Sequence, residues 1–107
     1  MPLPEVWQSK LFKDWLLNLR DRTGRAKIVT RILRLARGNP GDVKSVGGGV
    51  FELRISFGPG YRVYYTHRGT RFVVLLCGGD KSSQEQDIRR AKKLAQDVQE
   101  GEIEPWH

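Results

Sequence analysis

Four polar side chains, Glu52, Arg54, Arg62 and Tyr64, fall at alternating positions of two strand-like runs on either side of the turn Gly58-Pro59-Gly60. Gly-Pro-Gly cannot continue a strand, so the two runs form a hairpin. Because side chains alternate between the faces of a strand, all four lie on one face of that hairpin. Two guanidinium groups beside a carboxyl and a phenol have the chemistry to bind a phosphate and to move protons. Charged side chains are costly to bury, so we expect this face to be exposed and to form the candidate site.

The pattern also predicts a register for the hairpin. With residues 58–60 as the loop, Ser56 pairs with Arg62, Arg54 with Tyr64 and Glu52 with Thr66. The apolar side chains of the same runs, such as Leu53 and Val63, then face the opposite way and are expected in the core.

The distribution of charge indicates a polyanionic partner. The chain has 107 residues and a formal net charge of +7, and residues 20–37 carry seven basic side chains against the single acidic residue Asp21. Within a helix predicted there, Lys27, Arg31 and Arg34 lie on one face, at i, i+4 and i+7. Arginine suits phosphate because its planar fork bonds bidentately. These side chains are candidates for RNA binding; the alternative is a solvated helix face.

Other features of the sequence limit the class of protein to which the chain can belong. The length predicts one domain over residues 1–107. Cys77 is the only cysteine, which excludes an internal disulfide, and its apolar surroundings predict that it packs as a small hydrophobic residue. We expect no membrane helix, because no apolar segment reaches the required length of about 20 residues. The start of the chain lacks the features of a signal peptide, which favours the cytoplasm.

The elements that must position the site are a short strand, two helices, a run of antiparallel strands and a last helix, in that order. After a short strand at 5–8, Ser9 is a predicted helix N-cap. The pattern predicts a first helix that Gly24 ends and a second helix at 25–37. Strands follow at 43–46, 50–57, 61–67 and 72–77, and the last is apolar throughout, as expected for a strand covered on both faces. A third helix begins near Ser82 and Ser83, and 102–107 is predicted to be a tail. This order predicts an α+β fold.

The chain resembles a known toxin family over residues 5–98. The matching segments are Phe12, Trp15, Leu16 and Leu19; Arg31, Ile32, Arg34 and Leu35; Gly38, Asn39, Gly41, Asp42 and Lys44; Gly49, Val50, Glu52, Leu53, Arg54 and Ile55; Gly58-Pro59-Gly60-Tyr61-Arg62-Val63-Tyr64-Tyr65; Leu75, Leu76 and Gly78-Gly79-Asp80-Lys81; and Gln84, Asp87, Ile88 and Ala91. In these segments the chain is similar to the addiction-module killer branch of the RelE/ParE toxin superfamily, close to HigB-type toxins.

This resemblance implies a fold and a function. The fold is α+β and microbial-RNase-like, with two N-terminal helices packed on a twisted antiparallel sheet and a C-terminal helix. The function is that of a toxin in a type II toxin–antitoxin system, which cuts messenger RNA on the ribosome without a metal or other cofactor. The implied partners are a helix-turn-helix antitoxin, messenger RNA and the ribosome. Two alternatives remain open: a ParE-like inhibitor of DNA gyrase, and a binding module without toxicity.

The resemblance also assigns roles to residues. Arg62 matches an arginine that binds the reacting phosphate, Lys81 falls where a later basic residue is expected, and Arg54 lies on the same hairpin face. Lys44, in a matching segment, joins the RNA-binding candidates. The usual lysine pair, C-terminal tyrosine and catalytic histidine are missing, since His67 lies at a turn and His107 at the end. The general acid and base therefore stay open among three candidates: Glu52, Asp87 and Tyr64.

Overall fold

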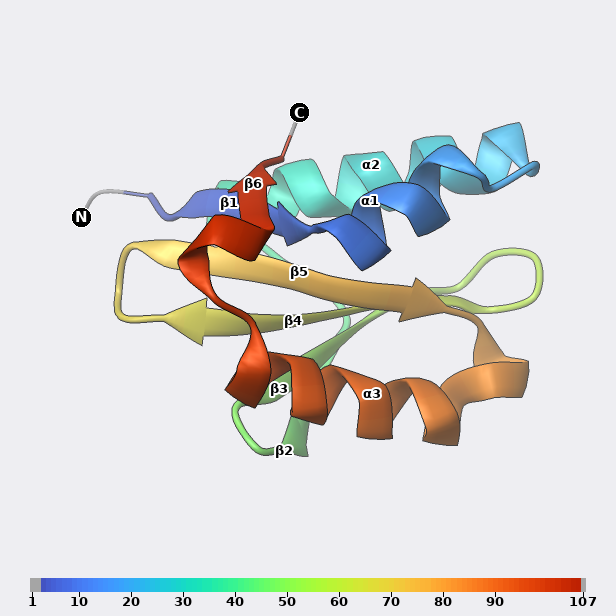
Figure 1. Ribbon diagram of the computed structural model, residues 1–107. Coiled ribbons are helices and arrows are strands. Elements are labelled where there is room, and N and C mark those ends of the chain that lie inside the picture. The colour runs from blue at the N-terminus through green and yellow to red at the C-terminus, as the bar shows by residue number, and fades with distance from the viewer. Residues whose placement is uncertain (1–2, 107) are drawn as a thin grey trace.

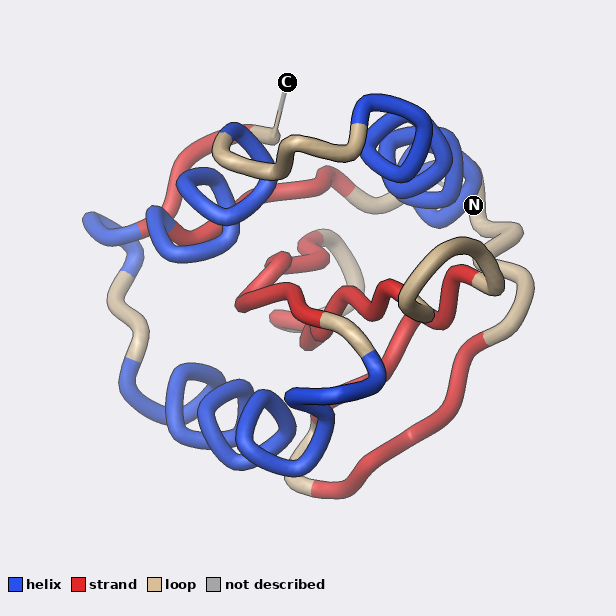
Figure 2. Tube along the Cα trace, turned by 90° about the vertical axis from the view of Figure 1, so that its right-hand side faces the viewer, coloured by secondary structure: helices blue, strands red, loops and turns tan. Residues whose placement is uncertain are grey.

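A six-stranded sheet lies between two layers of helix in the computed structural model, which describes residues 3–106 (Figure 1). The strands are β1 (Glu5–Ser9), β2 (Val43–Gly47), β3 (Val50–Ile55), β4 (Tyr61–Arg68), β5 (Phe72–Gly79) and β6 (Ile103–Pro105). The helices are α1 (Lys10–Leu17), α2 (Arg22–Ala36) and α3 (Gln84–Asp97), with 3-10 turns at Lys81–Ser83 and Glu100–Glu102. The helices α1 and α2 cover one face of the sheet and α3 covers the other, as Figure 2 shows from the side. The predicted α+β class is confirmed.

The sheet is mixed, so the prediction of an antiparallel sheet is wrong. Its strand order is β2-β3-β4-β5-β1-β6, and β1 runs parallel to β5 while the other neighbours are antiparallel. The helices α1 and α2 carry the chain from β1 back across the sheet, and β1 then lies beside a strand that comes more than 60 residues later. The microbial-RNase-like arrangement implied by the resemblance stays a prediction.

Two apolar layers hold the helices to the sheet. Side chains between the sheet and α1 and α2 include Phe12, Ile28, Ile32, Leu53, Val63 and Leu75. Side chains between the sheet and α3 include Val50, Tyr64, Val74, Leu76 and Ala91. Residues of β5 contribute to both layers, which confirms the prediction that this strand is covered on both faces.

The central hairpin has a longer loop than the sequence predicts. Arg54 lies opposite Arg62, and Glu52 lies opposite Tyr64, so the register differs from the predicted one by two residues. Residues 56–60 form the loop, here called the hairpin loop. Because the side-chain period of a strand is two, a shift of two residues leaves every side chain on its predicted face. The four polar side chains therefore share one face, as predicted.

Gly24 does not end a helix, as the sequence analysis expected, but lies in the first turn of α2. A β-carbon placed there would lie 2.5 Å from Cε2 of Tyr61. The glycine is thus needed for the close approach of α2 to β4, and the break between α1 and α2 falls earlier, at Asn18. The helix α2 begins at its N-cap Asp21, whose carboxylate accepts a hydrogen bond from the Gly24 amide.

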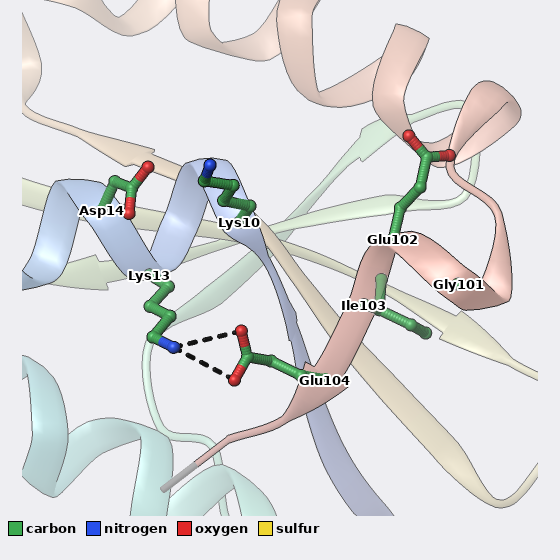
Figure 3. A pocket seen from close by; sticks show the side chains of 7 residues that line it. All are labelled: Lys10, Lys13, Asp14, Gly101, Glu102, Ile103 and Glu104. Carbon is green, nitrogen blue, oxygen red and sulfur yellow. Dashed lines mark hydrogen bonds and ion pairs between the residues drawn. The ribbon is translucent and has the colours of Figure 1, made fainter.

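The C-terminal segment is not a loose tail. Residues 103–105 form β6, which pairs with β1, and the side chain of Trp106 is buried against the first apolar layer. Nζ of Lys13 on α1 lies 3.2 Å from both carboxylate oxygens of Glu104 (Figure 3). His107 lies outside the described residues. Within residues 3–106, none of the helices has the length and apolarity to cross a membrane.

Ser9 links the first strand, the first helix and the central sheet. Its buried Oγ accepts a hydrogen bond from the Phe12 amide at 3.1 Å and donates one to the Leu76 carbonyl at 2.6 Å. Ser9→Ala removes the cap and leaves a buried carbonyl unpaired, so we expect the free energy of unfolding to fall by about 2 kcal/mol. Urea denaturation measures it. The matched change Ser56→Ala, at an exposed loop position, should cost less than about 0.5 kcal/mol. Equal losses for the two variants would show that the hydrogen bonds of the Ser9 hydroxyl do not stabilise the fold.

Candidate functional site

A buried carboxylate, Glu52, lies at the centre of the polar face. Its side chain is 1% exposed. Oε2 accepts hydrogen bonds from the Tyr64 hydroxyl and from Nε2 of Gln84, both at 2.9 Å. Nε of Arg62 lies 3.6 Å from Oε2, and Nε of Arg54 lies 4.0 Å from Oε1. We call these five side chains the Glu52 cluster.

The two arginines of the Glu52 cluster face its carboxylate with their Nε atoms, at distances longer than a normal hydrogen bond. The Nε atoms of Arg54 and Arg62 and Oε1 of Glu52 are buried and have no hydrogen-bond partner. The Arg54 side chain is 37% exposed and also lies 3.3 Å from Asp42, whereas the Arg62 side chain is only 13% exposed. One edge of the cluster therefore reaches solvent through Arg54.

The polar face is not the open surface that the sequence analysis expected. The helix α3 lies across it, and Tyr64 and Glu52 are both fully buried. Burial, together with the hydrogen bond to Glu52, raises the pKa of the Tyr64 hydroxyl far above its usual value. Tyr64 therefore stays protonated at neutral pH and serves as a donor. Because the ring is fully buried, it is not available to stack on a base.

Lys81 is brought next to Arg62 by the hairpin loop. Its backbone amide donates to the Pro59 carbonyl at 3.4 Å, and Nη1 of Arg62 donates to the Gly60 carbonyl at 2.6 Å. A β-carbon added at Gly60, whose φ is +81°, would lie 3.1 Å from that Nη1 and 3.4 Å from Cβ of Lys81. Glycine at this position therefore allows both cationic residues to approach the loop. Lys81 itself is exposed.

Asp87, the third acid–base candidate, is buried on the inner face of α3. Its Oδ2 accepts a hydrogen bond from Oγ of Ser83 at 2.5 Å, and the same oxygen packs directly against Gly79. Gly79 lies opposite Arg62 in the sheet, which places Asp87 at the inner edge of the Glu52 cluster. Cys77 lies beside it, and burial raises the pKa of that thiol to about 12. The prediction that Cys77 packs as a hydrophobic residue is confirmed.

The four RNA-binding candidates separate into two groups. Lys44, which is exposed, lies directly opposite Glu52 on the edge strand β2 and so belongs to the polar face. Lys27, Arg31 and Arg34 lie on α2, across the sheet. Arg31 is already engaged, since its guanidinium donates to the carbonyls of Pro40, Asp42 and Arg54. It braces the loop before β2, whereas Lys27 and Arg34 are exposed.

Gln84 is a member of the cluster that the sequence analysis did not single out as a site residue. It is the first residue of α3, and its amide fixes the Glu52 carboxylate. Gln84, Asp87, Ile88 and Ala91 follow the i, i+3, i+4, i+7 spacing of one helical face. Two polar residues on an otherwise apolar inner stripe were the signal that could have identified it. Among residues 3–106, histidine, cysteine and carboxylate side chains form no group of three that could hold a metal ion.

Comparison with known proteins assigns the chain to a family. Residues 14–99 match the family described as phage derived protein Gp49-like. The chain belongs to the Gp49-like family. It is also 54% identical over 94 residues to a protein of Haemophilus influenzae described as an uncharacterized protein, a match that covers 88% of this chain and 95% of the relative. The Gp49-like match includes every member of the Glu52 cluster, together with Lys81 and Asp87.

The burial of the cluster changes what we expect of Arg62 in this Gp49-like protein. Sequence reasoning placed it among solvated neighbours, where its loss would cost about 1 kcal/mol of stability. Arg62→Ala instead removes the closest cation from a buried carboxylate, so we expect a loss of about 2–4 kcal/mol. Arg54→Ala, at the more exposed position, should cost about 1 kcal/mol. Denaturant unfolding of both variants measures the two losses of stability. Equal losses would contradict the closer and more buried contact of Arg62 with the Glu52 carboxylate.

Tyr64 should make the stability of this Gp49-like protein depend on alkaline pH. Its pKa is raised in the folded state, so its contribution is fully present below its unfolded pKa of about 10 and is lost as pH rises above that value. Tyr64→Phe removes both the hydrogen bond and the titration. We expect the variant to be about 1–2 kcal/mol less stable at pH 7, with the difference shrinking above about pH 10. Thermal unfolding at stepped pH measures this, and a difference independent of pH would contradict it.

Proposed function

We propose that the chain is the toxin of a type II toxin–antitoxin pair and cuts messenger RNA on the ribosome without a metal ion. The observation that carries the proposal is the pair of guanidinium groups, Arg54 and Arg62, held on either side of one buried carboxylate, with the Arg54 side chain reaching solvent. Membership of the Gp49-like family and the resemblance to RelE/ParE toxins support the same reading. The cytoplasm is the compartment in which this activity would occur.

In the proposed reaction the RNA supplies its own nucleophile. The 2′-hydroxyl oxygen attacks the neighbouring phosphorus, the bond to the 5′-oxygen breaks, and the products carry a 2′,3′-cyclic phosphate and a 5′-hydroxyl. Arg54, Arg62 and Lys81 offset the extra negative charge that develops on the phosphate. Glu52 holds the two arginines at a fixed separation, because their charges would otherwise repel one another across the hairpin.

The proton transfers are assigned to the same three candidates. Glu52 or Asp87, as carboxylates, would accept the proton that leaves the 2′-hydroxyl, and Tyr64, which is held protonated, would donate one to the departing 5′-oxygen. Asp87 accepts a hydrogen bond from Ser83 and lies on the buried inner face of α3. For Glu52, Asp87 or Tyr64 to touch a substrate, the start of α3 must move away from the sheet. We propose that binding to the ribosome or to RNA produces that movement.

A second candidate function is inhibition of DNA gyrase without cleavage of RNA. The observation that favours it is the burial of Glu52, Tyr64 and Asp87, which leaves cations but no proton-transfer group at the surface of the cluster. Such a surface binds an anionic target but does not cut it. In either function, the +7 charge of the chain favours an acidic antitoxin, which we propose is a small helix-turn-helix protein.

Induced expression distinguishes the two functions. We expect protein synthesis to stop and translated messages to acquire internal ends that carry a 5′-hydroxyl. Lys81→Ala and Arg54→Gln, which change exposed or half-exposed cations, should each slow cleavage by about 10²–10³. Lys93→Ala, at an exposed position on the outer face of α3, is the matched control and should stay fully toxic. Intact messages with gyrase-trapped DNA breaks would favour the second function, and full toxicity of both site variants would reject the Glu52 cluster.

A further inference from the structure

A second surface feature lies on the other side of the hairpin loop from the Glu52 cluster. It is a groove of about 500 Å³ between α2 and residues 55–57. Its lining includes Thr23, Lys27, Thr30, Ile55, Ser56 and Phe57. We call it the α2 groove. It lies where α2 meets the end of β3 and the start of the hairpin loop.

The lining of the α2 groove combines a cation, hydroxyl groups and an aromatic ring. Nζ of Lys27 is held 5.0 Å from the centre of the Phe57 ring, so the charge is fixed at the groove rather than free in solvent. Thr23, Thr30 and Ser56 add hydroxyl groups along the walls. Asp21, the acidic residue nearest in sequence, is engaged by the Gly24 amide and the Tyr61 hydroxyl. Single-stranded nucleic acid is typically bound by such a mixture of fixed cations and aromatic rings.

The α2 groove and the Glu52 cluster lie on opposite sides of the backbone of Arg54. Nη1 of Arg31, which lines the groove, donates to the backbone carbonyl of Arg54, whose side chain belongs to the cluster. The ladder between β2 and β3 ends at Leu53, and only the Arg54 amide continues it, to the Asp42 carbonyl. The edge of residues 55–57 is therefore not covered by a neighbouring strand. A flexible strand can pass around this edge from one cationic surface to the other.

We propose that the α2 groove is a subsite for a nucleotide several positions along the strand from the cleaved phosphate, with its phosphate on Lys27 and its base against Phe57. This inference rests on the proposed function and adds a path for the RNA around the edge of the hairpin. Arg31 is not a ligand in this arrangement, because its guanidinium is occupied by three carbonyls. Its role is to hold the wall of the groove against the strand that carries Arg54.

Binding of single-stranded RNA tests the subsite separately from cleavage. The probe is a 2′-fluoro oligonucleotide of about 10 nucleotides, a length within the usual footprint of such sites, which lacks the hydroxyl needed for self-cleavage. Fluorescence anisotropy over a range of salt gives affinity and salt dependence together. Lys27→Ala should lower the slope of log K against log salt by about 0.7, the value for one phosphate contact on a single strand. Phe57→Leu keeps an apolar side chain but removes the ring, and should weaken binding about fivefold or more.

Two controls separate failure of the subsite from failure of the proposed function. Lys93→Ala should leave both affinity and slope unchanged, and a trinucleotide, too short to reach both surfaces, should not distinguish Lys27→Ala from the unmodified chain. If the unmodified chain binds the longer RNA and Lys27→Ala binds it equally well at every salt concentration, the subsite is wrong while the nuclease proposal stands. If Lys27→Ala weakens binding of an acidic protein partner but not of RNA, the groove is a protein-docking surface, which also overturns the inference. RNA bound through the groove but never cut would reject the nuclease proposal alone.

Discussion

The burial of the Glu52 carboxylate is the constraint on which the rest of the polar face depends. Removing a carboxylate from water costs several kcal/mol unless cations and hydrogen-bond donors replace the lost solvation. Here the replacements come from four places in the chain: the same strand, the neighbouring strand, the hairpin partner of Glu52 and the first residue of α3. The carboxylate therefore requires β3, β4 and α3 to converge on one point. A shift of any of these elements would leave a charge unpaired.

The hairpin loop is held from both sides, which gives the site its rigidity. On the side of α2, the Tyr61 hydroxyl donates to Asp21 at 2.8 Å. Hydrogen bonds from the Gly24 amide and from Tyr61 lower the pKa of the Asp21 carboxyl, so it stays ionised as an N-cap. On the side of α3, the Lys81 amide donates to the Pro59 carbonyl. The loop thus connects the two helical layers at this end of the sheet, and it separates the Glu52 cluster from the α2 groove.

Much of the fold follows from local patterns. The hairpin, the apolar strand β5, the N-cap at Ser9 and the start of α3 near Ser83 were all predicted, because each depends on residues close together in the sequence. The face shared by Glu52, Arg54, Arg62 and Tyr64 was also predicted, and it survives a register error of two residues because the period of a strand is two. The parallel pairing of β1 with β5 was not, since no local signal relates residues so far apart in the chain.

The amino-acid sequence by itself determined which side chains share a face and which segments are helical or extended, because these properties follow from short-range periodicity and turn chemistry. Only the tertiary structure decided whether a face is open or covered. The docking of α3 turned an expected surface into a buried cluster, made Gln84 part of it and removed Tyr64 from solvent. The packing of α2 against the sheet likewise made Arg31 a brace and Gly24 a point of close approach. Burial depends on contacts between elements distant in the chain, and such contacts exist only once the layers are assembled.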